Sequence, residues 1–293
     1  MEGTTCGGRS DDTIKATIFD IQRCSFVDGS GIRTTVFFKG CNLKCKWCHN
    51  PEGLSKSKGL LIYRDKCVGC GKCEKVCPNH LKFCDLCGKC TLYCASDARE
   101  LCGKEYTKEE LFEKIIKDKH FYDSSNGGVT FSGGECMLQI DFLAEILKLC
   151  KQANINTAID TAGNVPYEYF ERVIPYTDTF LYDIKCITED LHKQYTSVSN
   201  NQILLNLKKL SAYFKGEIII RIPIICGFND TDSEILKIAE YLKSLSIKSI
   251  ELLPYHKMGA HKYDALNMDF TEFSEPTKER MEYLNLLIKQ NTL

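Results

Sequence analysis

Strand-like and helix-like segments alternate along the chain from residue 107 to residue 289. The strand-like segments are short and rich in β-branched residues, whereas the segments between them have helical periodicity. The predicted strands are 14–22, 32–39, 128–133, 156–160, 179–185, 217–223 and 249–255, and the predicted helices are 107–121, 137–153, 166–174, 201–214, 232–245 and 276–289. Thr107 and Glu110 predict a capping box at the start of the first helix. Such alternation indicates parallel strands joined by right-handed crossovers. We therefore predict an α/β fold, a partial (β/α)6 TIM-type barrel of parallel strands, with a doubly wound open sheet as the alternative.

Polar or glycine-rich residues follow the apolar part of five predicted strands. These segments read SGGE, DTAG, DIK, RIPII and PYHKMG. Because the carboxyl ends of parallel strands meet at one face of such a fold, the five segments predict a binding site there. Turn formation alone is the alternative, since Gly, Asp and Asn favour loops.

Cysteine is the unusual residue in the composition, with 18 among 293 residues. The 38 basic and 39 acidic residues nearly cancel, and no apolar run is long enough to span a bilayer. The stretch MEGTTCGGRSDD at residues 1–12 lacks the apolar core of a signal peptide. We therefore expect a cytoplasmic protein without a nucleic-acid or membrane partner. In that reducing compartment the cysteines bind metal as thiolates rather than forming disulfides.

Three cysteines fall within eight residues of the stretch GCNLKCKWCHNPEG, at Cys41, Cys45 and Cys48. A structural zinc site takes four protein ligands, and a catalytic one takes three plus water. A 4Fe–4S cluster normally takes four thiolates, one per iron. With three thiolates, one iron keeps an open position that can bind a ligand carrying both an amine and a carboxylate. This trio of cysteines therefore predicts a cluster that also holds a substrate.

Two further runs of four cysteines lie between residues 67 and 94. They share the x2, x2, x3 spacing of bacterial ferredoxins, in which the fourth cysteine of each run ligates the other cluster. The predicted sets are Cys67, Cys70, Cys73 and Cys94 for one 4Fe–4S cluster, and Cys84, Cys87, Cys90 and Cys77 for the other. Pairing within each run is the alternative. We predict a ferredoxin-like domain at 59–103, inserted into a barrel formed by 1–58 and 104–293, and Cys102 is close enough in sequence to be a spare ligand.

The cysteine trio and its surroundings resemble the activating enzymes of glycyl-radical enzymes, which belong to the radical S-adenosylmethionine (SAM) superfamily. The stretch DGSGIRTTVFFKGCNLKCKWCHNPE resembles their N-terminal signature, and GGVTFSGGE, DTAG, YDIK, GFND and LLPYHKMG resemble later blocks in the same order. Ser30 departs from the family's usual proline, whereas Asp28 and Arg33 are retained. Similar cysteine-rich inserts occur in some members, but not in those that serve pyruvate formate-lyase.

The resemblance implies a partial barrel in which Cys41, Cys45 and Cys48 hold the catalytic cluster and an iron chelates SAM. Trp47 occupies the aromatic place near adenine, Glu135 the place near the methionine amine, and His256 the place near the ribose. The full set of implied SAM-binding residues is Trp47, Cys48, His49, Gly133, Gly134, Glu135, Asp160, Asp183, Ile184, Lys185, Arg221 and His256. In some relatives, aspartates at the places of Asp160 and Asp183 also help to hold a monovalent cation.

The resemblance also implies the reaction. One electron splits SAM into methionine and a 5′-deoxyadenosyl radical, which abstracts hydrogen from a glycine Cα of a partner glycyl-radical enzyme. Flavodoxin or ferredoxin is the implied electron donor, and we expect the chain to act as a monomer. Asp28 is a candidate contact for the partner. The insert is expected to relay electrons or, alternatively, to dock the partner.

Two other functions remain open at this stage. One is a radical SAM enzyme that modifies a small molecule or peptide with the help of auxiliary clusters. The other is an electron carrier with two clusters fused to a barrel, which would leave the cysteine trio without a purpose. Formation of 5′-deoxyadenosine on reduction would separate the enzymes from the carrier.

Overall fold

The structure is a computed structural model that describes residues 14–292. Within these residues the main sheet has eight strands. Their order across the sheet is β10 (Ile250–Pro254), β9 (Glu217–Ile224), β8 (Thr179–Asp183), β7 (Asn156–Thr161), β6 (Gly128–Gly133), β2 (Arg33–Phe38), β1 (Lys15–Ser25) and β5 (Lys104–Thr107). The residues 1–12 used above to judge a signal peptide lie outside the described part.

The six strands β2, β6, β7, β8, β9 and β10 are all parallel, and β1 runs antiparallel to both of its neighbours. The parallel strands follow one another across the sheet in chain order, so every crossover connection advances in the same direction. A doubly wound sheet would instead reverse its order at a switch point. The predicted parallel α/β fold is therefore confirmed, and the doubly wound alternative is wrong.

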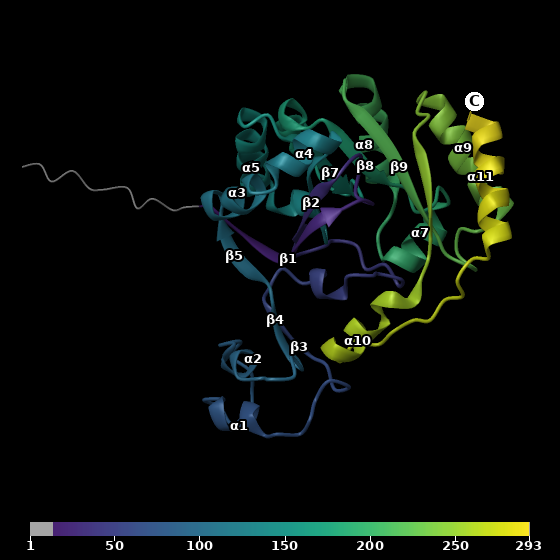
Figure 1. Ribbon diagram of the computed structural model, residues 1–293. Helices are drawn as coiled ribbons and strands as arrows, with labels where there is room; N and C mark the ends of the chain where they lie inside the picture. The colour runs from purple at the N-terminus through teal and green to yellow at the C-terminus, as the bar shows by residue number, and fades with distance from the viewer. Residues whose placement is uncertain (1–13, 293) are drawn as a thin grey trace, which may run out of the picture.

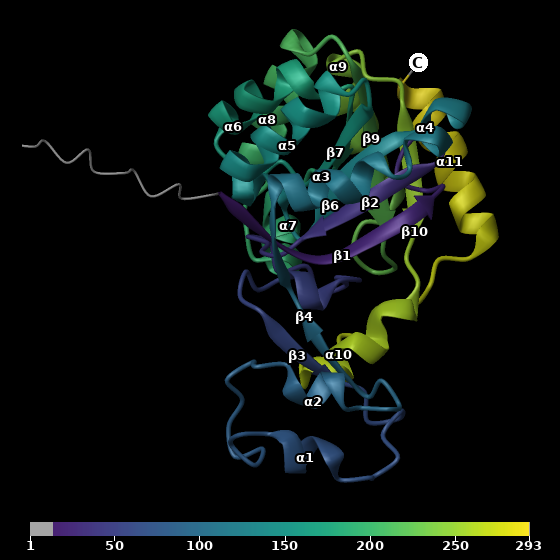
Figure 2. The same cartoon turned by 60° about the vertical axis from the view of Figure 1, so that its left-hand side comes forward.

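Helices cover the sheet and enclose the main apolar core. Figure 2 shows α3, α5, α6 and α8 gathered on one side of the strands. The helices of this part are α3 (Lys108–Ile116), α4 (Lys119–Ser125), α5 (Ile140–Gln152), α6 (Tyr167–Val173), α7 (Glu189–Thr196), α8 (Asn201–Tyr213), α9 (Asp232–Ser244) and α11 (Lys278–Thr292). Fully buried side chains such as Phe131, Leu143 and Ile220 join strands and helices into one cluster. Burial of this apolar area is the main stabilising term of the fold.

The segment predicted as one helix at 107–121 forms two. Thr107 caps α3, and the predicted capping box with Glu110 is confirmed. The helix ends before Asp118, whose buried carboxylate accepts hydrogen bonds from Arg23 and Thr34. These partners lie far away in the sequence, so this end of α3 is fixed by tertiary contacts that helical periodicity does not report.

The cysteine-rich segment lies apart from the main sheet (Figure 1). It begins with β3 (Gly59–Ile62) and ends with β4 (Arg99–Cys102), which pair antiparallel in a sheet of their own. Two short helices, α1 (Lys72–Val76) and α2 (Lys89–Leu92), lie beyond this hairpin. A small apolar cluster of Leu61, Tyr63, Cys102 and Ala265 joins the hairpin to α10 (Ala260–Leu266). In the described residues, no helix is both long enough and apolar enough to cross a bilayer.

Candidate functional site

A cavity of about 490 Å³ opens at the carboxyl ends of the parallel strands. Five successive strands, β6 to β10, each place at least one residue in its wall, as the polar strand ends predicted. The predicted site residues that line it are Cys41, Cys45, Trp47, Cys48, His49, Gly133, Gly134, Asp160, Asp183, Lys185, Arg221 and His256. The fold therefore gathers residues from position 41 to position 256 around one space.

The loop that carries the cysteine trio follows β2 and is fixed by main-chain hydrogen bonds. Gly40 N donates to Gly53 O at 2.7 Å, and Cys41 N donates to Leu54 O at 3.0 Å. The hydroxyl of Tyr263, on α10, donates to Cys48 O at 2.8 Å. Because the loop is bonded on both sides, the three thiols are held on a rigid frame before any ligand binds.

The two glycines of SGGE allow β6 to end directly against this loop. Glu135 N donates to Gly40 O at 2.7 Å. A Cβ at Gly134 would lie 2.3 Å from Gly40 O and 2.7 Å from Gly53 O, and Gly133 has φ +118°. No residue with a side chain fits at Gly134 without moving the backbone of the trio loop.

A Gly134→Ala variant is expected to lose about 1–3 kcal/mol of unfolding free energy, because the added methyl overlaps two carbonyl oxygens. Thermal unfolding of the anaerobically reconstituted protein measures this loss. Gly59→Ala is the matched control, since its Cβ would meet nothing within 4 Å. Equal melting temperatures for the two variants would contradict the close approach of the two backbones.

Glu135 does not line the cavity, although its neighbours do. Its buried carboxylate accepts hydrogen bonds from Thr161 Oγ1 at 2.9 Å, Ala162 N at 3.0 Å and Met137 N at 3.2 Å. Burial raises the pKa of Glu135 to about 7, although these three donors oppose the shift. The carboxylate therefore fastens the end of β6 to the end of β7, directly behind the cavity wall.

Ile184 also lies away from the cavity, buried in the main core. Its N–H donates to Arg221 O at 3.0 Å and so extends the pairing of β8 with β9.

Four charged side chains face one another across β7, β8 and β9. Arg221 Nη1 lies 3.4 Å from Asp160 Oδ2, and Lys185 Nζ donates to Asp183 Oδ2 at 3.0 Å. Burial raises the pKa of Asp160, with a further rise from Asp183 and an opposing effect from Arg221. Burial alone would lower the pKa of Lys185, but the Asp183 carboxylate and the neighbouring Cys45 and Cys41 together outweigh burial and raise that pKa. The site can therefore bind both an anionic and a cationic group.

Several buried polar atoms at the cavity have no hydrogen-bond partner among residues 14–292. They are Arg221 Nε, His49 Nε2, Tyr255 OH and Arg221 Nη1, which has only its 3.4 Å ion-pair contact with Asp160. Buried polar groups are almost always hydrogen-bonded, so unpaired atoms here favour a polar ligand. The charge-separated amino-acid part and the hydroxylated sugar of SAM offer partners of the required kinds.

The aromatic side of the cavity is formed by Trp47 and two histidines. Trp47 is 5% exposed and packs on Phe228, with 4.6 Å between the ring centroids. The rings of His49 and His256 stack with centroids 4.1 Å apart and an interplanar angle of 17°. These rings supply the flat, mainly apolar walls that a nucleobase and its ribose would need.

Asp28 and Arg33 of the DGSGIR loop are held by structural hydrogen bonds. Asp28 Oδ2 accepts from Ser25 Oγ and Thr35 Oγ1, each at 2.7 Å. The buried Arg33 donates to Thr130 Oγ1 at 2.7 Å. The loop next to them exposes Val27, which is 74% accessible and also lines the cavity.

The arrangement of thiols fits an iron–sulfur cube better than a single ion. Among residues 14–292, no three His, Cys, Asp or Glu side chains converge as ligands of one metal ion. A zinc site requires such convergence, whereas a cube spreads its thiolates because each binds a different iron. Cys41, Cys45 and Cys48 all line one cavity, so each thiolate can bind a different iron of one cube.

A second cavity, of about 170 Å³, lies inside the cysteine-rich segment. Four of its lining residues are Cys77, Cys84, Cys87 and Cys90. This is the set predicted for one cluster, with the fourth cysteine of the first run beside three of the second. Leu60, Phe83, Leu101 and other apolar side chains complete the wall. Cys102 instead lies buried beside Lys39, with 3.6 Å between Sγ and Nζ.

Several cavity residues were not named individually from the sequence. Ala162, Pro223 and Tyr255 lie within the predicted segments DTAG, RIPII and PYHKMG, and Leu253 directly precedes the last of these. Val27 is different, because it lies in the loop between two antiparallel strands. The sequence around Val27 carries no signal that this side chain lines the cavity.

Comparisons with known proteins agree with this geometry. The profile of the Radical SAM superfamily matches residues 35–242. The chain is 43% identical to the trans-4-hydroxy-L-proline dehydratase activating enzyme of Clostridioides difficile, over 93% of this chain and 95% of that protein. It is 40% identical to the (2S)-3-sulfopropanediol dehydratase activating enzyme of Klebsiella oxytoca, over 86% of each. A solved radical SAM methyltransferase from Sphaerobacter thermophilus shares the fold, with a TM-score of 0.56 and 15% identity, over 97% of this chain and 73% of that one.

Proposed function

The chain belongs to the radical SAM superfamily and, within it, to the activating enzymes of glycyl-radical enzymes, and from this premise we propose which of its residues carry out the activation. The observation that supports the assignment of roles is the single cavity shared by three thiols, four charged side chains and an aromatic wall. Radical SAM activation requires a cluster and SAM to meet in one enclosed place, and this cavity is the candidate.

Cys41, Cys45 and Cys48 hold the catalytic cluster in this proposal. When bound there, the reduced cluster supplies the electron that cleaves SAM into methionine and a 5′-deoxyadenosyl radical. The main-chain bonds of the trio loop keep the three thiols in position. The buried aromatic wall around Trp47 helps to exclude water and stray hydrogen donors from the radical.

The four charged side chains orient SAM. Lys185 and Arg221 are the cations available for its carboxylate, since both line the cavity. Asp160 and Asp183 are the anions available for its ammonium group and ribose hydroxyls. Glu135 acts from behind the wall by fixing the ends of β6 and β7. It contacts the amine only if SAM binding rearranges its present hydrogen bonds.

His49, Trp47 and His256 contact the nucleoside part of SAM. The stacked histidine rings present an edge to the ribose, and His49 Nε2 is a buried atom awaiting a partner. The glycines of SGGE bring the main chain close to the methionine end. A monovalent cation between Asp160 and Asp183 is also part of the proposal, supported by two carboxylates on neighbouring strands.

Residues 59–103 form a module that holds two further 4Fe–4S clusters. The cavity lined by Cys77, Cys84, Cys87 and Cys90 supports one of them, and it favours exchange of the fourth ligands over pairing within each run. Cys67, Cys70, Cys73 and Cys94 hold the other. We propose that both relay electrons from an external flavodoxin or ferredoxin to the catalytic cluster.

If the fourth cysteine of each run ligates the cluster of the other run, substitutions of Cys77 and Cys94 should each disturb a different cluster. Cys77→Ser is expected to perturb the cluster of the second run, and Cys94→Ser that of the first, with the other cluster intact in each variant. Mössbauer and electron paramagnetic resonance spectra of reconstituted variants that also lack the catalytic trio resolve the two clusters. A double variant distinguishes exchange of the fourth ligands from pairing within each run. If the ligands are exchanged, Cys77→Ser combined with Cys84→Ser should leave one intact cluster. If that double variant loses both clusters, each run binds its own.

The partner is a glycyl-radical enzyme. The similar relatives serve dehydratases, decarboxylases and a lyase. The deciding experiment incubates the reduced enzyme and SAM anaerobically with a panel of such proteins. Electron paramagnetic resonance detects the glycyl radical, and 5′-deoxyadenosine is measured in parallel. A radical on one partner supports the proposal. Cleavage of SAM without a radical on any glycyl-radical enzyme, but with modification of a small molecule or peptide, would favour the other radical SAM function.

A further inference from the structure

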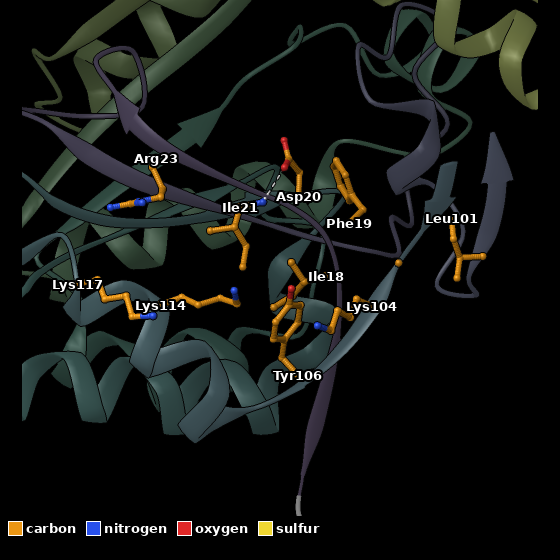
Figure 3. Close-up of a pocket in the computed structure, with 11 residues that line it drawn as sticks. Ile18, Phe19, Asp20, Ile21, Arg23, Leu101, Lys104, Tyr106, Lys114 and Lys117 are labelled. Carbon is orange, nitrogen blue, oxygen red and sulfur yellow. Dashed lines mark hydrogen bonds between the residues drawn. The ribbon is translucent and has the colours of Figure 1, made fainter. Parts of the chain in front are cut away.

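A third cavity, of about 340 Å³, lies where the cysteine-rich segment joins the barrel. Residues of β1, the end of β4, the edge strand β5 and the last turn of α3 surround it (Figure 3). The lining residues that matter here are Arg23, Leu101, Lys104, Tyr106, Lys114 and Lys117. This basic pocket shares none of its lining residues with the SAM cavity.

The basic pocket has an excess of positive charge. Within residues 14–292, Lys104, Lys114 and Lys117 have no carboxylate within ion-pair distance, whereas Arg23 is paired with Asp118. Asp20 is the carboxylate in the wall of the pocket. Three like charges around a concave surface focus the electric field, so they attract an anionic group from solution.

An aromatic ring lies between two of these charges. The ammonium groups of Lys104 and Lys114 lie 5.0 Å and 5.9 Å from the centroid of the Tyr106 ring, and Figure 3 shows them flanking it. All three lysines are exposed, and Tyr106 is partly buried. Small-molecule sites are mostly apolar and enclose their ligands, whereas exposed charges at a rim steer proteins. The pocket therefore fits the acidic surface of a protein.

The basic pocket is also adjacent to the cavity of a proposed cluster. Leu101 lines both the basic pocket and the cavity formed by Cys77, Cys84, Cys87 and Cys90. The two spaces therefore adjoin at Leu101. Electron transfer between proteins requires a short distance between the centres, so a carrier docked here would be well placed to reduce that cluster.

We propose that the basic pocket docks the acidic face of the one-electron carrier protein that reduces this enzyme. The carrier loses one electron and the cluster of Cys77, Cys84, Cys87 and Cys90 gains it, with no bond made or broken. This inference rests on the proposed relay function of residues 59–103. It adds the place where electrons enter the chain.

The test uses a triple variant, Lys104→Glu, Lys114→Glu and Lys117→Glu, of the reconstituted enzyme. Stopped-flow absorbance follows its reduction by a reduced, acidic flavodoxin. At low ionic strength the second-order rate constant is expected to fall about 10- to 100-fold relative to the unmodified protein. The rate for the unmodified protein should fall steeply with added salt, and the variant should lose most of that dependence.

Lys209→Glu is the matched control. Lys209 Nζ also lies over a tyrosine ring, 4.9 Å from the ring centroid of Tyr167, but Lys209 is on α8 and outside the basic pocket. This control variant should leave the rate unchanged. An unchanged rate in the triple variant, or an equal loss in the control, would overturn the proposal. The proposal would also be overturned if calorimetry showed tight binding of ATP or phosphate to the pocket and the triple variant were still reduced by flavodoxin at the same rate.

Photoreduction with a neutral deazaflavin separates this inference from the proposed function. Once photoreduced, the triple variant should cleave SAM as fast as the unmodified protein. If both proteins fail to form 5′-deoxyadenosine, the proposed roles of the SAM cavity are wrong. If both form it while flavodoxin reduces them equally fast, only the docking site is wrong.

Discussion

A Cys45→Ser variant is expected to form no detectable 5′-deoxyadenosine, a loss of at least about 1,000-fold, because without the cluster no electron reaches SAM. The thiol lies in the loop that main-chain bonds hold against β6, and its neighbours Cys41 and Cys48 line the same cavity. Serine keeps the size of the side chain but is a poor iron ligand. The product is measured by chromatography after reduction with dithionite and SAM.

The iron content of the same variant tests the number of clusters. Three 4Fe–4S clusters give about twelve irons per chain, so loss of the catalytic one should leave about eight. Cys24→Ser, at an exposed cysteine outside the three cavities, should keep both iron and activity. Retention of full iron and of SAM cleavage by Cys45→Ser would show that the cavity does not hold the catalytic cluster.

A Glu135→Ala variant is expected to show the largest loss of stability among the site substitutions. Its carboxylate is the partner of three buried donors, on Thr161, Ala162 and Met137. Leaving a buried donor unpaired costs about 1–3 kcal/mol, so for the three donors together we expect a loss of at least about 3 kcal/mol. Such a loss is a large part of the stability of an ordinary domain. Chemical denaturation of the anaerobic apoprotein measures it.

Two further variants separate the role of Glu135 in stability from a role in binding SAM. Glu135→Gln keeps one carbonyl acceptor and should recover part of the stability. Asp141→Ala removes an exposed ion pair with Arg172 and should cost less than about 1 kcal/mol. If Glu135→Ala unfolds like the unmodified protein but binds SAM much more weakly, the carboxylate contacts the ligand directly and its bonds to the β7 end are incidental.

The central strands of the barrel could be predicted closely because their short runs of apolar and β-branched residues are largely buried, as in β6 and β8. The predicted strand 128–133 coincides with β6, and 179–185 differs from β8 only at its end. The hairpin of β3 and β4 was missed because each strand has only four residues. Their partners are about 40 residues apart, so neither strand has a local signal. Helix α10 was missed for a similar reason, since its packing partners are the trio loop and β3.

The site was predictable to the extent that it follows from chain topology. Parallel strands bring their carboxyl ends together, so DTAG, DIK and RIPII had to meet once the alternation of strands and helices was recognised. The behaviour of individual side chains was not predictable in this way. Glu135 turns toward Thr161 and Ala162, and Arg33 is buried against Thr130. The orientations of these side chains depend on hydrogen-bond donors and acceptors that only folding brings close to them.

The hairpin of β3 and β4 brings the two ends of the cysteine-rich segment together. Gly59 is the register partner of Cys102, and Ile62 is that of Arg99, so the chain leaves the barrel and returns to it at one point. A stretch whose ends are adjacent can be acquired or discarded in a single recombination event, because the host strands on either side keep their spacing. An ancestral barrel could therefore have gained, lost or exchanged the cysteine-rich segment while its SAM cavity stayed unchanged.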